Sequence, residues 1–250
     1  YQRALDARGE AERLAAELRG ALSTRDDFLA SAAHDLRNPL SAIRGAADLL
    51  ERTLERGDVP RERLAASIAH IQSASRRIAG MLDGFLDLAQ LELGRPLELR
   101  KELQDVAALA REVVAQCQQA SSRHRVRFAA PRELMAVVDG PRLQRAMDNL
   151  VVNAIKYSPE GGEIEVELRE EADQLLFSVR DSGIGIPPSE VEAVFERFRR
   201  GSNVAGRFSG TGIGLAAVRG IVEQHGGSVE VKSALGRGSA FTLRLPTGRP

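Results

Sequence analysis

A histidine followed directly by a carboxylate is the pair of residues in this sequence best suited to nucleophilic chemistry. His34 and Asp35 lie in the run SAAHDLRNPL, which begins at Ser31. One nitrogen of a neutral imidazole can attack an electrophile, while an adjacent carboxylate accepts the N–H proton of the other nitrogen or fixes the tautomer. A solvated histidine beside a solvated aspartate, with no chemical role, is the simpler interpretation of the same pair. The choice between the two depends on motifs more than a hundred residues downstream.

The first of these motifs is a pair of asparagines spaced by one helical turn. Asn149 and Asn153 lie in the run DNLVVNAIKY, so both amides and Lys156 are near one face of a helix that ends at about Tyr157. An amide oxygen is a hard, neutral ligand that can share Mg²⁺ with phosphate oxygens and water, and a lysine adds a point charge. Asparagine pairs are also common on solvated helix faces, so this motif alone is weak.

The second motif, DSGIGI, follows a predicted strand and combines a carboxylate with two glycines. Asp181 can accept a hydrogen bond from an exocyclic amine such as that of adenine, and Gly183 and Gly185 would let the backbone approach a flat ligand. A glycine-rich turn with a surface aspartate is the alternative. The motif is not a dinucleotide fingerprint, because no helix begins at it and its spacing differs.

Two further motifs are typical of a phosphate site. The run FERFRR begins at Phe195 and leads into residues 201–210, which are a disordered loop or a lid that orders over ligand, with Arg199 or Arg200 within reach of phosphate. A glycine-rich helix start then offers free backbone N–H groups to an anion. Its residues are Gly210, Thr211, Gly212, Ile213, Gly214 and Leu215.

The order of the motifs is a more specific signal than any single motif. His-Asp-x-x-Asn-Pro, the paired-asparagine helix, Asp-x-Gly-x-Gly, Phe-x-x-Phe and Gly-x-Gly-x-Gly-Leu together resemble the sensor histidine kinases of two-component signalling, over about residues 25–245. The resemblance implies a dimerisation and phosphotransfer hairpin followed by an ATP-binding domain of the type shared with gyrase, mismatch-repair and heat-shock chaperone ATPases. It also implies ATP and Mg²⁺ as cofactors, a homodimer, and transfer of the phosphoryl group to an aspartate on the receiver domain of a response regulator.

The resemblance also assigns roles to single residues. His34 is the expected phospho-acceptor, Asp35 is the acid that activates it, in place of the glutamate of many members, and Asn38 orients water for a phosphatase activity in bifunctional members. Asn153 is the expected Mg²⁺ ligand. The residues implied in nucleotide binding are Asn149, Asn153, Lys156, Tyr157, Asp181, Gly183, Gly185, Arg199, Gly210, Thr211, Gly212, Gly214 and Leu215.

Two other classes of protein explain part of the pattern. An ATPase or ATP-driven clamp uses the same kind of pocket, but it leaves His34 without a role and usually carries a water-activating glutamate where this chain has Asn149. A module that only dimerises and docks a partner leaves the glycine motifs unexplained. Autophosphorylation of a histidine, followed by transfer to a response regulator, accounts for all of the motifs.

Composition limits the class of protein. The chain has 250 residues, 43% of them hydrophobic, and 35 basic residues balance 35 acidic ones, so no net charge favours nucleic acid or a membrane surface. A single cysteine, Cys117, excludes an intrachain disulfide and fits a cytoplasmic location. No apolar run approaches the about 20 residues of a membrane span. The chain starts without Met, so we expect a fragment whose upstream part is missing, including a sensor or a membrane segment that would anchor the full-length protein.

Two long helices are expected to carry the histidine. Residues 1–56 and a stretch ending at about Leu93 show helical periodicity, separated by a turn at 57–60. Pro39 is expected to kink the first helix just below His34. The apolar seam of that helix comprises Leu29, Leu36, Leu40, Ile43, Ala47, Leu50 and Leu54. Two such seams exceed what one hairpin can bury, which favours a dimeric four-helix bundle.

The second half alternates strands and helices and predicts a different architecture. Strands are expected at 96–101, 125–129, 134–138, 162–169, 174–180, 228–232 and 239–245, and helices at 105–119, 141–157 and 212–224. The fold class is therefore multidomain, α and α+β, with the helical hairpin followed by an α/β two-layer sandwich. The expected domains are a coiled-coil signalling helix (1–24), a dimerisation and phosphotransfer domain (25–95) and a catalytic ATP-binding domain (96–250).

The remaining histidines and the cysteine are expected to be structural. His70 lies next to a seam position and Cys117 within a helical pattern, so both are expected to pack. His124 lies in a strand. His225 is expected as a cation at the end of a helix, where positive charge suits the helix dipole.

Overall fold

The computed structural model describes residues 30, 32, 33, 36–52, 54, 61–92, 98–204, 207, 208 and 212–248. His34 and Asp35, the predicted coiled coil at 1–24, and Gly210 with Thr211 lie outside the described residues. The described residues divide into two compact units, one ending at Met81 and one starting at Leu82. The two units are considered separately, and the predicted domain boundaries stay a prediction.

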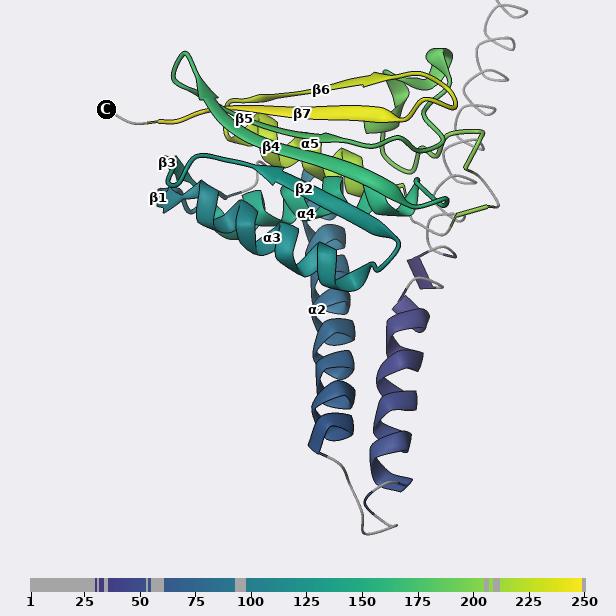
Figure 1. Ribbon diagram of the computed structural model, residues 1–250. Helices are drawn as coiled ribbons and strands as arrows, with labels where there is room; N and C mark the ends of the chain where they lie inside the picture. Colours follow the sequence, from purple (N-terminus) through teal and green to yellow (C-terminus); the bar gives the residue numbers. More distant parts are fainter. Residues whose placement is uncertain are drawn as a thin grey trace, which may run out of the picture. The chain divides into compact units, whose positions relative to one another are not determined.

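Two helices make up the first unit. Residues 36–52 are helical, and α2 runs over Arg61–Glu92, of which the part up to Met81 belongs to this unit (Figure 1). Pro39 is buried within the first of these helical runs. The predicted kink next to His34 stays a prediction.

The seam predicted for the first helix is only half buried. Leu36, Ile43 and Leu50, seven residues apart, are partly buried, whereas Leu40 and Leu54 are 59% and 62% exposed. Ala47 is exposed too, so a single hairpin leaves part of this seam uncovered, in line with the predicted excess of apolar surface. The reason is that one partner helix shields only one side of an apolar face that is wider than a single contact seam. His70 is exposed as well, so its predicted packing role is wrong.

The second unit is a sheet with three helices on one face (Figure 1). The sheet has the order β2-β4-β5-β7-β6, in which β2 pairs with β4 in parallel and the other neighbours are antiparallel. Its strands are β2 (His124–Ala129), β4 (Gly162–Glu171), β5 (Gln174–Arg180), β6 (Ser228–Ser233) and β7 (Ser239–Pro246). The helices are α3 (Val106–Ala120), α4 (Gly140–Lys156) and α5 (Gly214–Gln224). A short antiparallel pair, β1 (Glu102–Asp105) and β3 (Met135–Val138), completes the unit.

Side chains along the strands point alternately to the core and to the open face of the sheet. Leu175, Phe177 and Val179 of β5 are at most 1% exposed and pack in one cluster with the buried sides of the three helices. The residues between them point to the opposite face, as the period of two requires. This arrangement confirms the predicted two-layer sandwich.

The strand predicted at 96–101 is the one element of the second unit that is misplaced. Residues 98–101 are irregular, and β1 begins at Glu102, opposite Val138 of β3. Leu99 still packs against the core. The alternating apolar pattern of this segment therefore reflects the burial of an extended chain that is not paired with a neighbouring strand. Two short 3₁₀ helices, Pro188–Glu190 and Ala193–Phe195, were not predicted.

Candidate functional site

Asp181 directly follows β5 and is held rigidly at the end of that strand. It is 6% exposed, and its Oδ1 accepts hydrogen bonds from the backbone N–H groups of Gly183 (2.8 Å) and Ser239 (3.2 Å). Burial raises the pKa of the Asp181 carboxyl, and these two hydrogen bonds oppose the shift. Its Oδ2 forms no hydrogen bond with any residue that the structure describes. One carboxylate oxygen therefore stays available to an external donor such as an amine.

The two glycines of this loop are required by protein packing. A Cβ on Gly183 would lie 2.1 Å from the carbonyl oxygen of Tyr157, and a Cβ on Gly185 would lie 2.1 Å from that of Ala234. Gly185 also has a φ of +66°, in the left-handed region that favours glycine. From the sequence alone, these glycines are expected to let the backbone approach a ligand. The structure shows a different cause, because they let the loop lie against the end of α4 and against the β6–β7 turn.

We expect Gly183→Ala to weaken nucleotide binding at least about tenfold, because the added methyl must push the Asp181 loop away from the end of α4. The overlap is with a backbone oxygen at 2.1 Å, so no side-chain rotation relieves it. Gly80→Ala in α2 is the matched control, since its Cβ meets nothing within 4 Å. Equal affinities for an ATP analogue in Gly183→Ala and wild type, measured by calorimetry, would contradict this account of the loop.

α4 places the predicted polar residues along the edge of the core. Leu150, Val151 and Ala154 are buried, which leaves Asn149 and Asn153 half-buried at the edge of the same helix. Asn149 Nδ2 donates to the carbonyl of its own helix at Arg145 (3.1 Å), whereas the Asn153 amide forms no hydrogen bond within the described residues. The prediction that the two amides share a helix face is confirmed, and Asn153 is the one whose side chain is available.

The Asn153 amide fits a metal ion that is also held by phosphate. Among the described residues there is no group of three histidine, cysteine or acidic side chains that could hold a metal ion alone. Mg²⁺ keeps several waters and is commonly bound by one or two protein oxygens together with substrate phosphates. A neutral amide oxygen that has no partner in the described part of the chain suits that mode of binding.

The start of α5 lies against the same stretch of α4. A Cβ on Gly214 would lie 2.9 Å from Asn149 Oδ1, so glycine is needed for this close approach. Gly212 has a φ of +71°, and its carbonyl accepts a hydrogen bond from Phe198 N (3.1 Å). Leu215 packs on the core, so only its backbone can serve a ligand in the predicted way.

The N-terminus of α5 differs from those of the other two helices in the second unit. Asp105 caps α3 and Asp139 caps α4 through side-chain hydrogen bonds, whereas Ile213 at the start of α5 provides none. Within the described residues, the first N–H groups of α5 therefore have no side-chain cap, and they carry the positive end of the helix dipole. These N–H groups can bind an anion, whereas the Asn149 Oδ1 beside them is an acceptor and its Nδ2 is already bonded to the Arg145 carbonyl.

The segment between the glycine motifs is bonded to the Asp181 loop. Asn203 Nδ2 donates to the Gly185 carbonyl (2.8 Å), and the Phe208 ring packs edge-on against Tyr157 with 5.3 Å between centroids. Arg200 donates to the carbonyls of Val204 and Phe208, so its guanidinium is engaged. Two arginines are predicted to reach phosphate. Among the described contacts, only the exposed Arg199 has a guanidinium that donates no hydrogen bond to a backbone carbonyl.

The Lys156 ammonium lies 4.8 Å from the centre of the Tyr157 ring. Both side chains are half-buried at the end of α4, and the Tyr157 carbonyl accepts a hydrogen bond from Ile184 N (3.0 Å). The end of α4 and the Asp181 loop are therefore joined by backbone. This contact brings the predicted lysine, tyrosine and aspartate into one part of the second unit.

The residues that hold Asp181 in place lie on β6, on β7 and in the turn between them, and they are not predicted from the sequence. Ser239 N bonds to the Asp181 carboxylate, and the Ser233 hydroxyl accepts from Ile186 N (2.9 Å) and donates to the Gly238 carbonyl (2.8 Å). A Cβ on Gly238 would lie 2.0 Å from the Asp181 carbonyl oxygen. The signal was a third glycine motif, GRGS at residues 236–239, which reads locally as an ordinary hairpin turn.

Ser158→Ala removes a buried hydroxyl that has no hydrogen-bond partner among the described residues. We expect this substitution to raise the melting temperature by about 2–4 °C. Ser233→Ala is the matched control, because it removes a hydroxyl with two backbone partners and should destabilise the protein. A loss of stability in Ser158→Ala as large as that in Ser233→Ala, in thermal unfolding, would show that the Ser158 hydroxyl is satisfied in solution.

His225 is structural, as predicted, but it is neutral and not a cation. It is 5% exposed, its Nδ1 donates to the Ile221 carbonyl (2.8 Å) and its Nε2 accepts from Asp139 N (3.0 Å). Desolvation lowers the pKa of its imidazole, outweighing the hydrogen bond to Ile221. It thus joins the end of α5 to Asp139, the residue that caps α4. The cation expected from the helix dipole does not form, because the acceptor role of Nε2 toward Asp139 N requires a neutral ring.

We expect this ring to make the protein less stable as the pH falls below 6.5, the ordinary pKa of histidine. The folded state holds His225 neutral while the unfolded state takes up a proton, so stability is present above that pH and is lost below it. His225→Gln keeps an acceptor and a donor but cannot titrate. In chemical unfolding measured between pH 7 and 5, the variant should lose up to about 1.4 kcal/mol per pH unit less than wild type. Parallel pH profiles for the two proteins would refute the assignment.

Two other predicted structural residues are confirmed. His124 is buried, with Nε2 2.8 Å from the Ser158 carbonyl oxygen and Nδ1 2.7 Å from the Ser121 hydroxyl. Cys117 is buried in the core, and burial raises the pKa of its thiol to about 12, with the nearby Asp148 adding to the shift. Such a thiol is unreactive at neutral pH.

Comparison with known protein families matches both halves of the chain. The family described as "Histidine kinase-, DNA gyrase B-, and HSP90-like ATPase" matches residues 138–249. The family described as "His Kinase A (phospho-acceptor) domain" matches residues 24–94. None of the helices in the described part of the chain is both long and apolar enough to cross a membrane.

Individual relatives are similar over most of the chain. It is 31% identical over 228 residues to sensor histidine kinase WalK of Bacillus subtilis, covering 89% of this chain and 36% of that protein. It is 36% identical over 221 residues to the probable sensor histidine kinase TcrY of Mycobacterium tuberculosis, covering 88% of this chain and 45% of that protein. The chain thus spans less than half the length of these curated relatives.

Solved structures show the same similarity. The mycobacterial sensor histidine kinase MprB matches with a TM-score of 0.54 and 30% identity, over 60% of this chain and 100% of that chain. Full-length ShkA, solved in complex with AMPPNP, matches with a TM-score of 0.60 and 25% identity, over 90% of this chain and 46% of that chain.

Proposed function

Because this chain belongs to the sensor histidine kinases of two-component signalling, we propose that it transfers the γ-phosphoryl group of ATP to the imidazole of His34. The second unit binds the nucleotide, and the first unit carries the acceptor. The phosphoryl group then passes to an aspartate on the receiver domain of a response regulator. His34 lies outside the described residues, so its role rests on its place in the phospho-acceptor family match.

The observation that carries nucleotide binding is the pairing of a rigid carboxylate with an uncapped helix. Asp181 presents a free Oδ2 that suits the exocyclic amine of adenine. The backbone N–H groups at the N-terminus of α5 have no side-chain cap, which suits the triphosphate. Both ends of one ATP molecule thus find groups of matching chemistry in the same unit.

The chemistry at His34 is an in-line displacement at phosphorus. The lone pair of a neutral imidazole nitrogen forms the N–P bond, the bond from the γ-phosphorus to the bridging oxygen breaks, and ADP leaves. Asp35 accepts the hydrogen bond of the second ring nitrogen and stabilises the positive charge that develops on the ring. Asn38, which is exposed one helical turn further on, orients water if the protein also dephosphorylates its partner.

Asn153 is the residue that would hold Mg²⁺, through the amide oxygen that has no partner among the described residues. When bound, the ion would neutralise charge on the triphosphate. Lys156 adds a further positive charge at the end of the same helix, and Arg199 adds one from an exposed position. Gly210 and Thr211 lie outside the described residues, and their contribution to the phosphate site stays a prediction.

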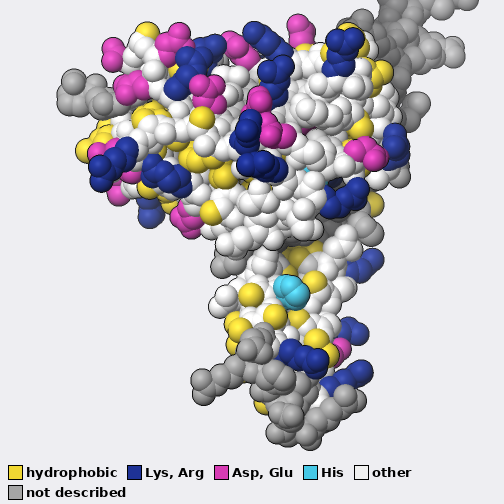
Figure 2. All heavy atoms as spheres, in the orientation of Figure 1, with side chains coloured by type: hydrophobic (Ala, Val, Ile, Leu, Met, Phe, Trp, Pro, Cys, Tyr) yellow, Lys and Arg dark blue, Asp and Glu magenta, His cyan; other side chains and the backbone are white. Residues whose placement is uncertain are grey.

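A homodimer is the proposed assembly. Leu40, Leu54 and Ile68 are 43–62% exposed in the single chain, and hydrophobic side chains are visible on the helical unit in Figure 2. A four-helix bundle formed by two hairpins would cover this surface. On the second unit, basic and acidic side chains are interspersed in the same view, which does not favour a nucleic-acid partner. The proposed location of this part of the protein is the cytoplasm, with an anchor or sensor elsewhere in the full-length protein.

The fate of the γ-phosphate of radiolabelled ATP separates the three classes of function. A histidine kinase retains acid-labile, base-stable label on the protein. Release of free phosphate alone would indicate an ATPase or clamp, and neither product would indicate an interaction module. We expect the first outcome, with label that a receiver domain then removes.

A further inference from the structure

Residues 198–204 form a bridging segment that contacts both ends of the proposed nucleotide site. At its first residue, Phe198 N donates to the Gly212 carbonyl (3.1 Å), close to the start of α5. Near its last residue, Asn203 Nδ2 donates to the Gly185 carbonyl (2.8 Å), in the loop that follows β5. The bridging segment is therefore bonded at the end of the site that suits phosphate and at the end that suits adenine.

The loop that follows β5 is held by other bonds besides the one from Asn203. Ile184 N donates to the Tyr157 carbonyl (3.0 Å) at the end of α4. Ile186 N donates to the Ser233 hydroxyl (2.9 Å) at the end of β6. Loss of the Asn203 hydrogen bond should therefore leave this loop in place and release only the bridging segment from it.

A tight turn presents the Asn203 amide to the loop. Val204 is buried, and its N–H donates to the Gly201 carbonyl (3.1 Å). Glu190 Oε2 accepts from Ser202 N (2.9 Å), which ties the turn to the first 3₁₀ helix. Hydrogen bonds from Ser202 lower the pKa of the Glu190 carboxyl, so this group stays ionised at neutral pH and keeps its acceptor role.

The side chains of Asn203 and Glu190 both lie against Gly201. A Cβ on Gly201 would lie 2.8 Å from Asn203 Oδ1 and 3.2 Å from Glu190 Oε2. The absence of a side chain at this position lets the amide and the carboxylate approach the same turn. A change in either group should therefore affect the position of the other.

We propose that Asn203, held in place through Glu190, is a positioning residue that couples the adenine end of the nucleotide site to its phosphate end. The inference rests on the proposed function, because it requires ATP to use both Asp181 and the start of α5. With the Asn203 bond in place, the bridging segment is ordered before the triphosphate arrives, which lowers the entropy cost of binding. Without this bond, the triphosphate must order the segment itself. Adenosine reaches only the Asp181 loop and loses nothing.

The test compares the affinities of the whole chain for adenosine and for a non-hydrolysable ATP analogue with Mg²⁺. NMR titration measures the weaker ligand, and calorimetry measures the tighter one. Asn203→Ala removes the amide that bonds to the loop, and Glu190→Ala removes the carboxylate that holds the turn. The double variant tests whether the two side chains act through the same turn.

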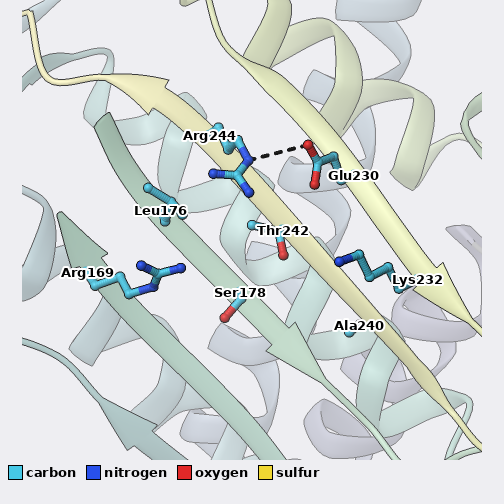
Figure 3. Close-up of a pocket in the computed structure, with 8 residues that line it drawn as sticks. All are labelled: Arg169, Leu176, Ser178, Glu230, Lys232, Ala240, Thr242 and Arg244. Atoms are coloured by element: carbon cyan, nitrogen blue, oxygen red, sulfur yellow. Dashed lines mark ion pairs between the residues drawn. The ribbon is translucent and has the colours of Figure 1, made fainter. Parts of the chain in front are cut away.

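Each substitution has a matched control outside the site. Gln116→Ala also removes an exposed amide, one that donates to Glu112 (3.0 Å) on α3. Glu230→Ala also removes a carboxylate, one that pairs with Arg244 at 3.4 Å on the open face of the sheet (Figure 3). Both controls should bind adenosine and the ATP analogue as the wild type does.

We expect Asn203→Ala to weaken binding of the ATP analogue at least about fivefold and to leave binding of adenosine within about twofold of wild type. Glu190→Ala should act in the same direction, and the double variant should lose less than the product of the two single losses. Equal losses for the two ligands, a loss in the controls as large as in the variants, or independent effects in the double variant would overturn the inference and leave ATP binding intact. A wild-type chain that binds neither ligand would instead overturn the proposed function, and this inference with it.

Discussion

His34→Gln is expected to reduce protein labelling from γ-labelled ATP to background, at least about a thousandfold below wild type. Glutamine has a similar polar reach but no nucleophilic ring nitrogen, so no N–P bond can form. Binding of an ATP analogue should stay within about twofold of wild type, because Asp181 and the start of α5 belong to the second unit. Labelling by gel autoradiography and affinity by calorimetry measure the two effects separately.

The matched control for this variant is His70→Gln. His70 is an exposed histidine on α2 of the same unit, so the same chemical change is made at a site without a proposed role. Its labelling should equal that of wild type. Label that persists on His34→Gln, or label that disappears in His70→Gln, would show that the acceptor has been assigned to the wrong residue.

Asn153→Asp is expected to slow metal-dependent phosphoryl transfer at least about a hundredfold. The substitution keeps the size of the side chain but adds a negative charge, which repels the triphosphate and alters the charge around the metal ion. The Asn153 amide has no partner among the described residues, so the change breaks no hydrogen bond there and should leave the melting temperature within about 2 °C of wild type. The rate of labelling as a function of Mg²⁺ and Mn²⁺ concentration measures the effect.

Gln174→Glu provides the control for added charge. Gln174 is exposed at the start of β5, so the same amide-to-carboxylate change falls away from the site. Unchanged metal dependence in Asn153→Asp, or an equal loss of rate in Gln174→Glu, would contradict the assignment of Asn153 as the metal ligand.

Helical periodicity was the most reliable guide from sequence to site. The buried positions of α4, such as Leu150 and Ala154, leave Asn149 and Asn153 at the edge of that helix, and Asn149 lies against the start of α5. The helical period of the apolar residues determines which residues lie at that edge, because the apolar side of the helix must pack against the sheet. The contact between Gly214 and Asn149 could not be predicted, because it depends on how two helices distant in sequence pack.

Residues that act through long-range contacts escaped the sequence analysis. Ser239 orients Asp181 across two strands, and His225 reaches Asp139, eighty-six residues earlier in the chain. Neither relation leaves a local pattern. The error about the charge of His225 has the same origin, because local position at a helix end suggested a cation while the tertiary hydrogen bond requires a neutral ring.

The glycines show how a correct assignment can rest on an incorrect reason. Gly183 and Gly185 were identified by their spacing after a strand, and they do lie beside Asp181. Their contacts are with the backbone at Tyr157 and Ala234, so they shape the loop and do not make room for ligand. The spacing of the motif indicates that glycine is required at these positions. Only the folded chain shows which neighbouring atoms lie where a side chain would be.

The most direct test of the whole account is to locate the phosphoryl group after incubation of the protein with Mg²⁺ and ATP. Mass spectrometry of peptides prepared at alkaline pH, which preserves phosphohistidine, identifies the modified residue. The account predicts one phosphoryl group per acceptor site, on the His34 imidazole, dependent on Asp181 and Asn153. Phosphoryl found on any other residue, or free phosphate with an unmodified His34, would contradict it.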